Sequence, residues 1–235
     1  TAAGKTILAN NLGNEISKSL NLNVQFFRLD WTLRNRKERK SDLDNLLKND
    51  DKFELEGEVH MKLEIFKNFL EKVQKLKYDE SNSLNNKFEI DNLYSRDDNG
   101  KCTGKNKFDF SKKTVLICEG HYTLRSEYRN LIDLNICLLS NKKELLKRKV
   151  ERVKGYRSSQ EAVNYFWKID VPSFSYHLKR FYKEIDLLVD NNDYESPHLL
   201  DISYVHKWIS EESKDNEKEV FQNIRKNDYI KIFNK

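Results

Sequence analysis

The sequence lacks any long apolar stretch, and it is poor in proline and cysteine. No run approaches eighteen consecutive apolar residues, so no membrane-spanning helix is expected. The chain has two prolines and three cysteines, none of which forms a Cys-x-x-Cys pair, and this argues against a zinc or redox site. Cys118 and Cys137 lie in apolar, strand-like runs, where cysteine behaves as a small hydrophobic residue. We therefore expect a protein of the reducing cytoplasm.

The charge balance gives no sign of a nucleic-acid partner. The 235-residue chain carries 43 basic and 38 acidic side chains, a net charge of +5. Acids are interleaved with nearly every basic stretch, whereas a nucleic-acid module needs a focused basic face with aromatic residues for stacking. The length is sufficient for one domain with a good core and some elaborations.

Strand-like and helical patterns alternate along the chain. Helical periodicity separates the strand-like runs, and such alternation predicts an α/β sandwich with a parallel sheet. Asn99-Gly100 predicts the turn of a small hairpin within 94–110. The tail has one amphipathic pattern, marked by Val205, Trp208 and Ile209. The expected strands are 23–29, 114–118, 134–139 and 185–189; the expected helices are 6–20, a stripe over 59–70, 141–153 with Ser140 as N-cap, 158–169 and 172–183.

The segment Gly4-Lys5-Thr6 at the start of a helix is the back half of a phosphate-binding P-loop. Such a loop directs backbone N–H groups at one anion, and the lysine adds charge while the hydroxyl is offered to Mg²⁺. The positive end of the following helix dipole acts on the same phosphates. We expect the first glycine of the motif and a central strand to lie upstream of Thr1.

Two carboxylates follow predicted strands. The carboxyl ends of parallel strands face the ligand crevice, so Asp30 could accept a proton from an attacking hydroxyl or hold Mg²⁺ through water. Glu119 stands where P-loop proteins place a second magnesium contact, and Gly120 would let the backbone bend there. His121 is a further candidate for the site, with packing or a simple hydrogen bond as the alternative.

A basic segment over 147–157 predicts a lid. Arg148 and Arg152 share a helix face, and Arg157 follows the potential hinge Gly155. Positive groups that close over a transferring phosphoryl group stabilise its charge, although a solvated helix face is the alternative. A second basic group, made of Arg34, Arg36 and Arg39, could bind an anionic substrate or simply be exposed.

These motifs, in this order, resemble the uridine kinase and phosphoribulokinase group of P-loop small-molecule kinases. The resemblance covers residues 1–191, which we take as a kinase domain, with 192–235 as an extension packed on it. The matching segments are AAGKT, RLDWTLRNRKER, TVLICEGHYTL, DLNICLLSNKKELLKRKVERVKGYRS and VPSFSYHLKRFYKEIDLLVDN.

The resemblance implies ATP- and Mg²⁺-dependent transfer of a γ-phosphoryl group to an alcohol. Asp30 would orient and deprotonate the hydroxyl, and Glu119 would support the metal or the substrate. The acceptor stays open among nucleosides, sugars, polyols and sugar phosphates, and so does the oligomeric state, a homodimer included. By the same resemblance, the nucleotide would contact Ala3, Gly4, Lys5, Thr6 and Ile7, with Lys5 on the β- and γ-phosphates and Thr6 on Mg²⁺. The substrate would contact Arg34, Glu119, His121 and Arg157. Arg148 and Arg152 would belong to the catalytic lid.

Two rival classes fit less well. A regulatory GTPase shares the P-loop, but Glu119-Gly120 stands where that class has Asp-x-x-Gly. The segment 141–144 is similar to the guanine-reading motif Asn-Lys-x-Asp of that class, but it ends in Glu rather than Asp. A kinase-like domain that binds nucleotide without catalysis, inside a larger protein, stays open as the alternative.

Overall fold

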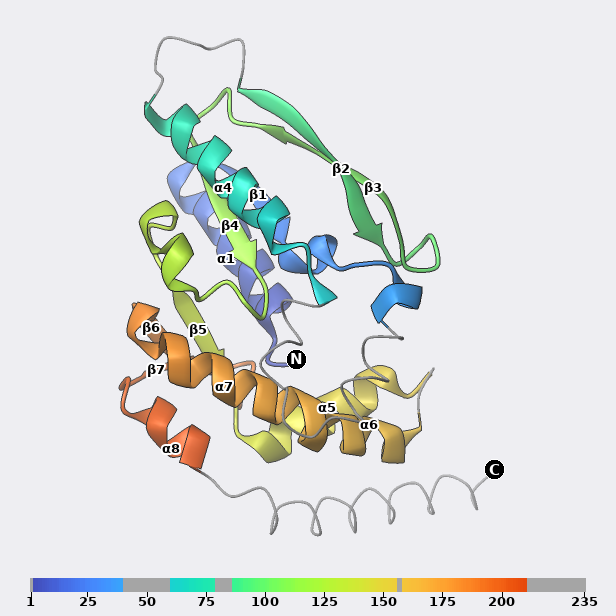
Figure 1. Cartoon of the computed structure of the whole chain (residues 1–235). Helices are drawn as coiled ribbons and strands as arrows, with labels where there is room; N and C mark the ends of the chain where they lie inside the picture. Colours follow the sequence, from blue (N-terminus) through green and yellow to red (C-terminus); the bar gives the residue numbers. More distant parts are fainter. Residues whose placement is uncertain (1, 40–59, 79–85, 156–157, 211–235) are drawn as a thin grey trace. The chain divides into compact units, whose positions relative to one another are not determined.

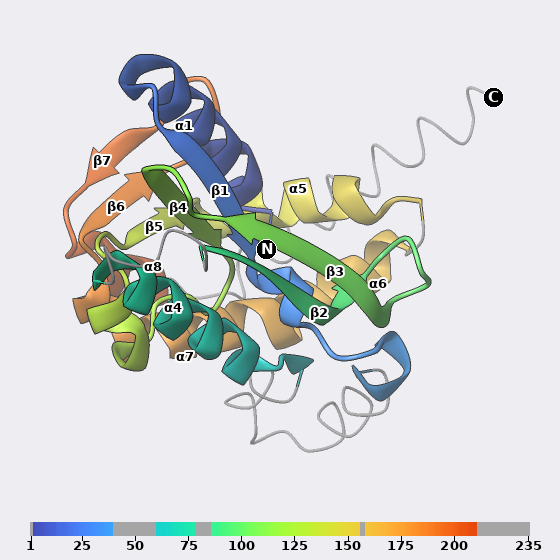
Figure 2. The same cartoon turned by 90° about the horizontal axis from the view of Figure 1, so that it is seen from above.

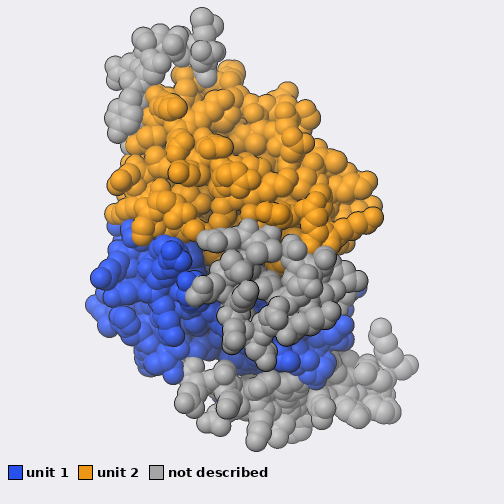
Figure 3. Space-filling view, in the orientation of Figure 1, with its two compact units in different colours: residues 1–4, 136–235 blue, residues 5–135 orange. Residues whose placement is uncertain are grey.

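The computed structural model describes residues 2–39, 60–78, 86–155 and 158–210. The chain divides into two compact units (Figure 3). The one described first below is Lys5–Asn135, orange and keyed as unit 2, and the second is Thr1–Gly4 with Ile136–Lys235, blue and keyed as unit 1. The sequence-based division at residue 191 therefore stays a prediction. None of the helices in these ranges has the length and apolarity needed to cross a bilayer.

The first unit is built on a parallel strand pair with a helix on each face. Strands β1 (Asn23–Arg28) and β4 (Thr114–Glu119) pair in parallel, and α1 (Lys5–Leu20) and α4 (Leu63–Tyr78) lie on opposite sides of them (Figures 1 and 2). Successive side chains of a strand point to opposite faces. Phe26 accordingly meets α1 at Gly13, whereas Phe27 packs on Phe66 and Phe69 of α4.

A hairpin completes this unit. Strands β2 (Lys87–Ser95) and β3 (Lys101–Asp109) are antiparallel, and positive φ angles of 52° at Asn99 and 77° at Gly100 form the predicted turn. The hairpin begins before the expected residue 94, because Phe88 stacks on Phe108 and so extends the pairing toward its base. Short 3₁₀ segments follow β1 and β4, at Leu29–Thr32 and Ser126–Leu131.

Over residues 136–155 and 158–210, the second unit has a three-stranded sheet and four α-helices. Strand β6 (Leu187–Asp190) pairs in parallel with β5 (Ile136–Leu139) and antiparallel with β7 (His198–Leu200). The helices are α5 (Lys142–Val153), α6 (Ser159–Tyr165), α7 (Val171–Phe181) and α8 (Tyr204–Ser210), and a 3₁₀ turn, Tyr182–Glu184, precedes β6. The expected mixture of helices and parallel strands is confirmed.

Two local expectations need correction. The N-cap of α5 is Asn141 and not Ser140, because the Asn141 side chain accepts a hydrogen bond of 2.8 Å from the backbone N–H of Glu144. The Ser140 hydroxyl donates instead to the backbone carbonyl of Asn191. The helices expected at 158–169 and 172–183 are not separated by a break, since a π-helical turn at Phe166–Asp170 joins α6 to α7.

The helix expected over 59–70 begins only at Leu63 and continues to Tyr78, because Met61 instead pairs with Leu33 in an isolated β-bridge. The amphipathic pattern expected in the tail is confirmed as α8. Val205 and Trp208 are the buried residues of α8, and Phe66 and Leu70 are buried in α4. Val59 lies outside the described residues.

Phe27 is the residue on which the core of the first unit centres, and it gives a direct test of the packing. It is fully buried and contacts rings from α4, the hairpin and the turn after β1, namely Phe66, Phe69, Phe108 and Trp31. Phe27→Ala should lower the free energy of unfolding by about 3–5 kcal/mol, because it removes a buried ring and leaves a cavity. Urea unfolding measures this change.

The control is Leu20→Ala in α1, where the side chain is 62% exposed. A change within about 0.5 kcal/mol is expected there. Equal losses in the two variants would contradict the assigned core.

Candidate functional site

The carboxyl ends of β1 and β4 bring the predicted acidic residues to one edge. The parallel register pairs Arg28 with Glu119, the last residues of the two strands. Asp30 follows two residues after Arg28, in the 3₁₀ turn that ends β1. Parallel strands place their carboxyl ends at the same edge, and this edge is where ligands of α/β folds bind.

The start of α1 contributes a hydroxyl to this edge. Thr6 Oγ1 donates a hydrogen bond to the Glu119 carboxylate, at 2.8 Å from Oε1 and 2.9 Å from Oε2. Arg28 Nε lies 3.6 Å from the same carboxylate. The two residues predicted to hold a metal ion are thus in direct contact, although they are 113 positions apart in the sequence.

Lys5 and His121 also meet at the start of α1. Lys5 Nζ lies 3.5 Å from His121 Nε2. His121 reaches this place because the chain passes tightly over the turn after β1 at Gly120, where a Cβ atom would lie 2.3 Å from Cβ of Leu29. Only glycine allows this close approach. Ile7, the next predicted nucleotide contact in α1, is 54% exposed.

Arg96 is a site residue that sequence reasoning missed. Its Nη2 lies 2.8 Å from Oδ2 of Asp30, and both side chains are partly exposed. The hairpin tip is held there by Arg36, whose N–H donates to the Gly100 carbonyl, and by Asn35, whose side chain accepts from the N–H of Cys102. The Asn99-Gly100 turn predicted the hairpin, but nothing in the sequence indicates where its tip docks.

The basic group after Asp30 has mixed surroundings. The Arg39 guanidinium lies over the Tyr94 ring, 4.8 Å from its centroid, and its Nε donates to the Arg34 carbonyl. Arg34 and Arg36 are exposed. Arg39 thus helps to hold the hairpin, and anion binding by this group stays a prediction.

The second unit holds the residues that precede α1. Ala2 and Gly4 have positive φ angles of 57° and 85°, the kind of backbone that turns successive N–H groups toward an anion. A Cβ atom at Gly4 would lie 2.5 Å from Nδ2 of Asn191 and 2.7 Å from the Tyr194 ring. Two constraints therefore require glycine here, and Lys5 follows it directly in the chain.

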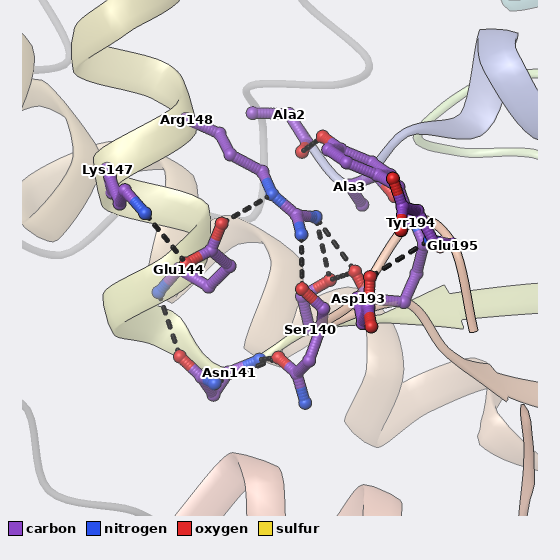
Figure 4. Close-up of polar contacts among 12 residues, drawn as sticks. Ala2, Ala3, Ser140, Asn141, Glu144, Lys147, Arg148, Asp193, Tyr194 and Glu195 are labelled. Atoms are coloured by element: carbon purple, nitrogen blue, oxygen red, sulfur yellow. Dashed lines mark hydrogen bonds and ion pairs between the residues drawn. The ribbon is translucent and has the colours of Figure 1, made fainter. Parts of the chain in front are cut away.

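The predicted lid residues lie in different surroundings. The Arg148 side chain is 10% exposed and forms an ion pair of 2.9 Å with Glu144 (Figure 4). It also donates to the carbonyls of Asn191 and Asn192. Arg152 is exposed in the last turn of α5. Arg157 lies outside the described residues. The roles assigned to these three residues stay predictions, but the contacts of Arg148 are those of a residue that holds the fold.

Structures of known proteins resemble this chain. A candidate fructose transport system kinase from Silicibacter sp. TM1040 aligns with a TM-score of 0.53 at 19% identity, over 77% of this chain and 81% of its own. A candidate uridine kinase from Bacillus stearothermophilus aligns with a TM-score of 0.52 at 14% identity, over 79% and 82%. No protein-family model and no curated protein sequence matches.

The resemblance extends to phosphoribulokinase from Rhodobacter spheroides, with a TM-score of 0.50 at 14% identity, over 75% of this chain and 63% of that one. The chain has the fold of the uridine kinase and phosphoribulokinase group. The similarity inferred from the motifs is thereby confirmed at the level of the fold, while the P-loop kinase roles of single residues are not tested by it.

Cys118 directly precedes Glu119, and its chemistry can be tested. Desolvation by burial raises the pKa of the Cys118 thiol from 9.0 to about 12. A thiol reacts as the thiolate, so this cysteine should be inert in the folded protein. We expect its alkylation by iodoacetamide at pH 8 to be slower than in urea by about 10³, the change in thiolate fraction.

Mass spectrometry of the peptide that contains Cys118 measures this rate in native and unfolded protein. Cys102, whose exposure falls in the same intermediate range as that of Cys118, serves as the internal comparison. Equal rates for Cys118 in the two states would show that the thiol is not desolvated.

Proposed function

We propose that the protein is a magnesium-dependent kinase of the cytoplasm that transfers the γ-phosphoryl group of ATP to a hydroxyl of a small molecule. The proposal places this chemistry on a three-layer P-loop fold. It is supported by the names of the structural neighbours, which are candidate or established kinases. The acceptor class is a nucleoside, sugar, polyol or sugar phosphate.

The contact between Thr6 and Glu119 carries the proposal. A hydroxyl and a carboxylate at 2.8 Å are oxygen donors of the type that Mg²⁺ prefers. Among the described residues, no group of three or more His, Cys, Asp or Glu side chains could hold a metal ion. A site of one hydroxyl and one carboxylate still fits Mg²⁺, which keeps several waters and binds substrate phosphates. When bound, the ion would neutralise charge on those phosphates.

The other residues of the candidate site would have separate roles in binding and catalysis. Backbone N–H groups at the start of α1, together with Lys5, would bind the phosphates. Asp30 would accept the proton of the attacking hydroxyl. Arg96, which holds the Asp30 carboxylate at 2.8 Å, would lie beside an acceptor bound there. Arg152 and Arg157 would supply the positive charge of the lid.

One observation favours the alternative of a non-catalytic nucleotide-binding domain. The carboxylate of Asp30 already accepts a hydrogen bond from Arg96. To act as a general base, Asp30 would have to use its other oxygen or lose the contact with Arg96 before it takes a proton. Nucleotide binding without acceptor-dependent turnover would support this alternative.

Two substitutions test the kinase proposal when ADP release is measured with each acceptor class. Lys5→Ala should abolish nucleotide use, because it removes the phosphate-binding charge. Asp30→Asn should retain nucleotide binding and lower turnover by about 10² or more, the contribution of a general base. Both variants are made in the full natural chain.

Each variant has a matched control on an exposed position. Lys18→Ala lies in the last turn of α1, and Glu71→Gln removes a carboxylate that is 45% exposed on α4. Both controls should turn over as the wild type does. An Asp30→Asn variant that loses nucleotide binding as severely as Lys5→Ala would contradict the role of general base.

A further inference from the structure

Asn191 links the end of β6 to the backbone just before α1. Its side-chain Nδ2 donates a hydrogen bond of 2.7 Å to the carbonyl of Ala3, and the residue is 5% exposed. Tyr194 lies over the same stretch, with its hydroxyl 3.5 Å from the carbonyl of Ala2. These two side chains are also the ones that a Cβ atom at Gly4 would strike. The shape of residues 2–4 is therefore set by the loop after β6.

The backbone of Asn191 is itself fixed by three hydrogen bonds. Its N–H donates to the carbonyl of Leu139 at 2.8 Å. Its carbonyl accepts from the hydroxyl of Ser140 at 2.9 Å and from Nη1 of Arg148 at 2.8 Å. Of these three hydrogen bonds, the one from Arg148 has a charged donor, and such a bond is stronger than one between neutral groups.

The guanidinium of Arg148 is held on several sides (Figure 4). Its Nε faces Glu144 at 2.9 Å, and its Nη2 donates to the carbonyl of Asn192 at 2.6 Å. Its Cζ lies over the Tyr194 ring, 3.8 Å from the ring centroid. A planar fork of donors can make these contacts together, whereas a lysine ammonium cannot.

We infer that Arg148 and Asn191 form a clamp that positions the phosphate-binding backbone of residues 2–4. Both are positioning residues, since they act on the nucleotide through Ala3 and Gly4. The inference rests on the proposed function, because it requires that this backbone bind nucleotide phosphates. It also separates Arg148 from Arg152, which is exposed on the same helix and keeps the predicted role in the lid.

The clamp and the lid predict different defects. A clamp residue affects nucleotide binding in the absence of an acceptor, whereas a lid residue acts on the transition state and lowers turnover with binding unchanged. The test is the Kd of a fluorescent N-methylanthraniloyl ADP with Mg²⁺, measured on the full natural chain without acceptor. The variants are Asn191→Asp, which is isosteric but turns an oxygen toward the Ala3 carbonyl, and Arg148→Lys, which keeps the charge.

Each variant should raise the Kd by about tenfold, the usual effect of leaving a buried hydrogen-bonding group unpaired. The double variant should raise the Kd by less than the product of the two single increases, because both changes release the same loop. The KM for the acceptor should not change. Asn164→Ala removes an exposed amide from α6 and should bind as the wild type does. Arg148→Met serves as a second variant that removes the charge as well as the fork of donors. Its Kd for the nucleotide should be no higher than that of Arg148→Lys, because the clamp depends on the geometry of the guanidinium rather than on its charge.

Three outcomes are distinguished. Higher Kd values at an unchanged acceptor KM support the clamp. Wild-type binding in Asn191→Asp and Arg148→Lys, or a loss of turnover alone in Arg148→Lys, overturns it and leaves the kinase proposal intact. Wild-type protein that binds no nucleotide overturns the proposed function, and the clamp with it. Circular dichroism at the assay temperature confirms that each variant is folded.

Discussion

The parallel pairing of β1 with β4 is the constraint on which the candidate site depends. The pairing of Arg28 with Glu119 brings together residues that are 91 positions apart, and it places the turn with Asp30 at the edge where β4 ends. A slip of β1 by one residue along β4 would turn Phe27 to the opposite face and would unpair Arg28 from Glu119. Phe27 opposes such a slip, because its ring is enclosed by Phe66 and Phe69. Packing of the apolar core therefore fixes the position of the charged edge.

The backbone before α1, for which we propose phosphate binding, depends on a second constraint that comes from elsewhere in the chain. Gly4 has a left-handed backbone conformation, and the space where a side chain would lie is occupied by Asn191 and Tyr194. A short motif read in the sequence is thus completed by residues almost 190 positions away. On the proposed function, the surrounding fold would thereby hold the N–H groups of residues 2–4 in the arrangement that binds an anion.

Sequence patterns predicted the positions of the strands better than the contacts between side chains. Apolar runs located β1, β4, β5 and β6 within three residues, because buried parallel strands leave a continuous apolar signature. The order of strands also predicted that the ends of β1 and β4 would share an edge. The pairing of Arg96 with Asp30 could not be predicted, since it depends on the docking of a hairpin tip. The spacing of Arg148 and Arg152 indicated one helix face, yet the Arg148 side chain is only 10% exposed, whereas Arg152 is exposed to solvent. Periodicity does not show which carbonyls lie within reach of a guanidinium.

The most direct test of the account is transfer of label from γ-labelled ATP to an isolated acceptor in the presence of Mg²⁺. Nucleosides, pentoses, polyols and their phosphates would be offered in turn to the full natural chain, with and without a chelator. The account predicts that one class becomes labelled at a hydroxyl oxygen, and that the chelator abolishes labelling. Label that is released only as inorganic phosphate, at the same rate with every acceptor and with none, would contradict the assignment as a small-molecule kinase.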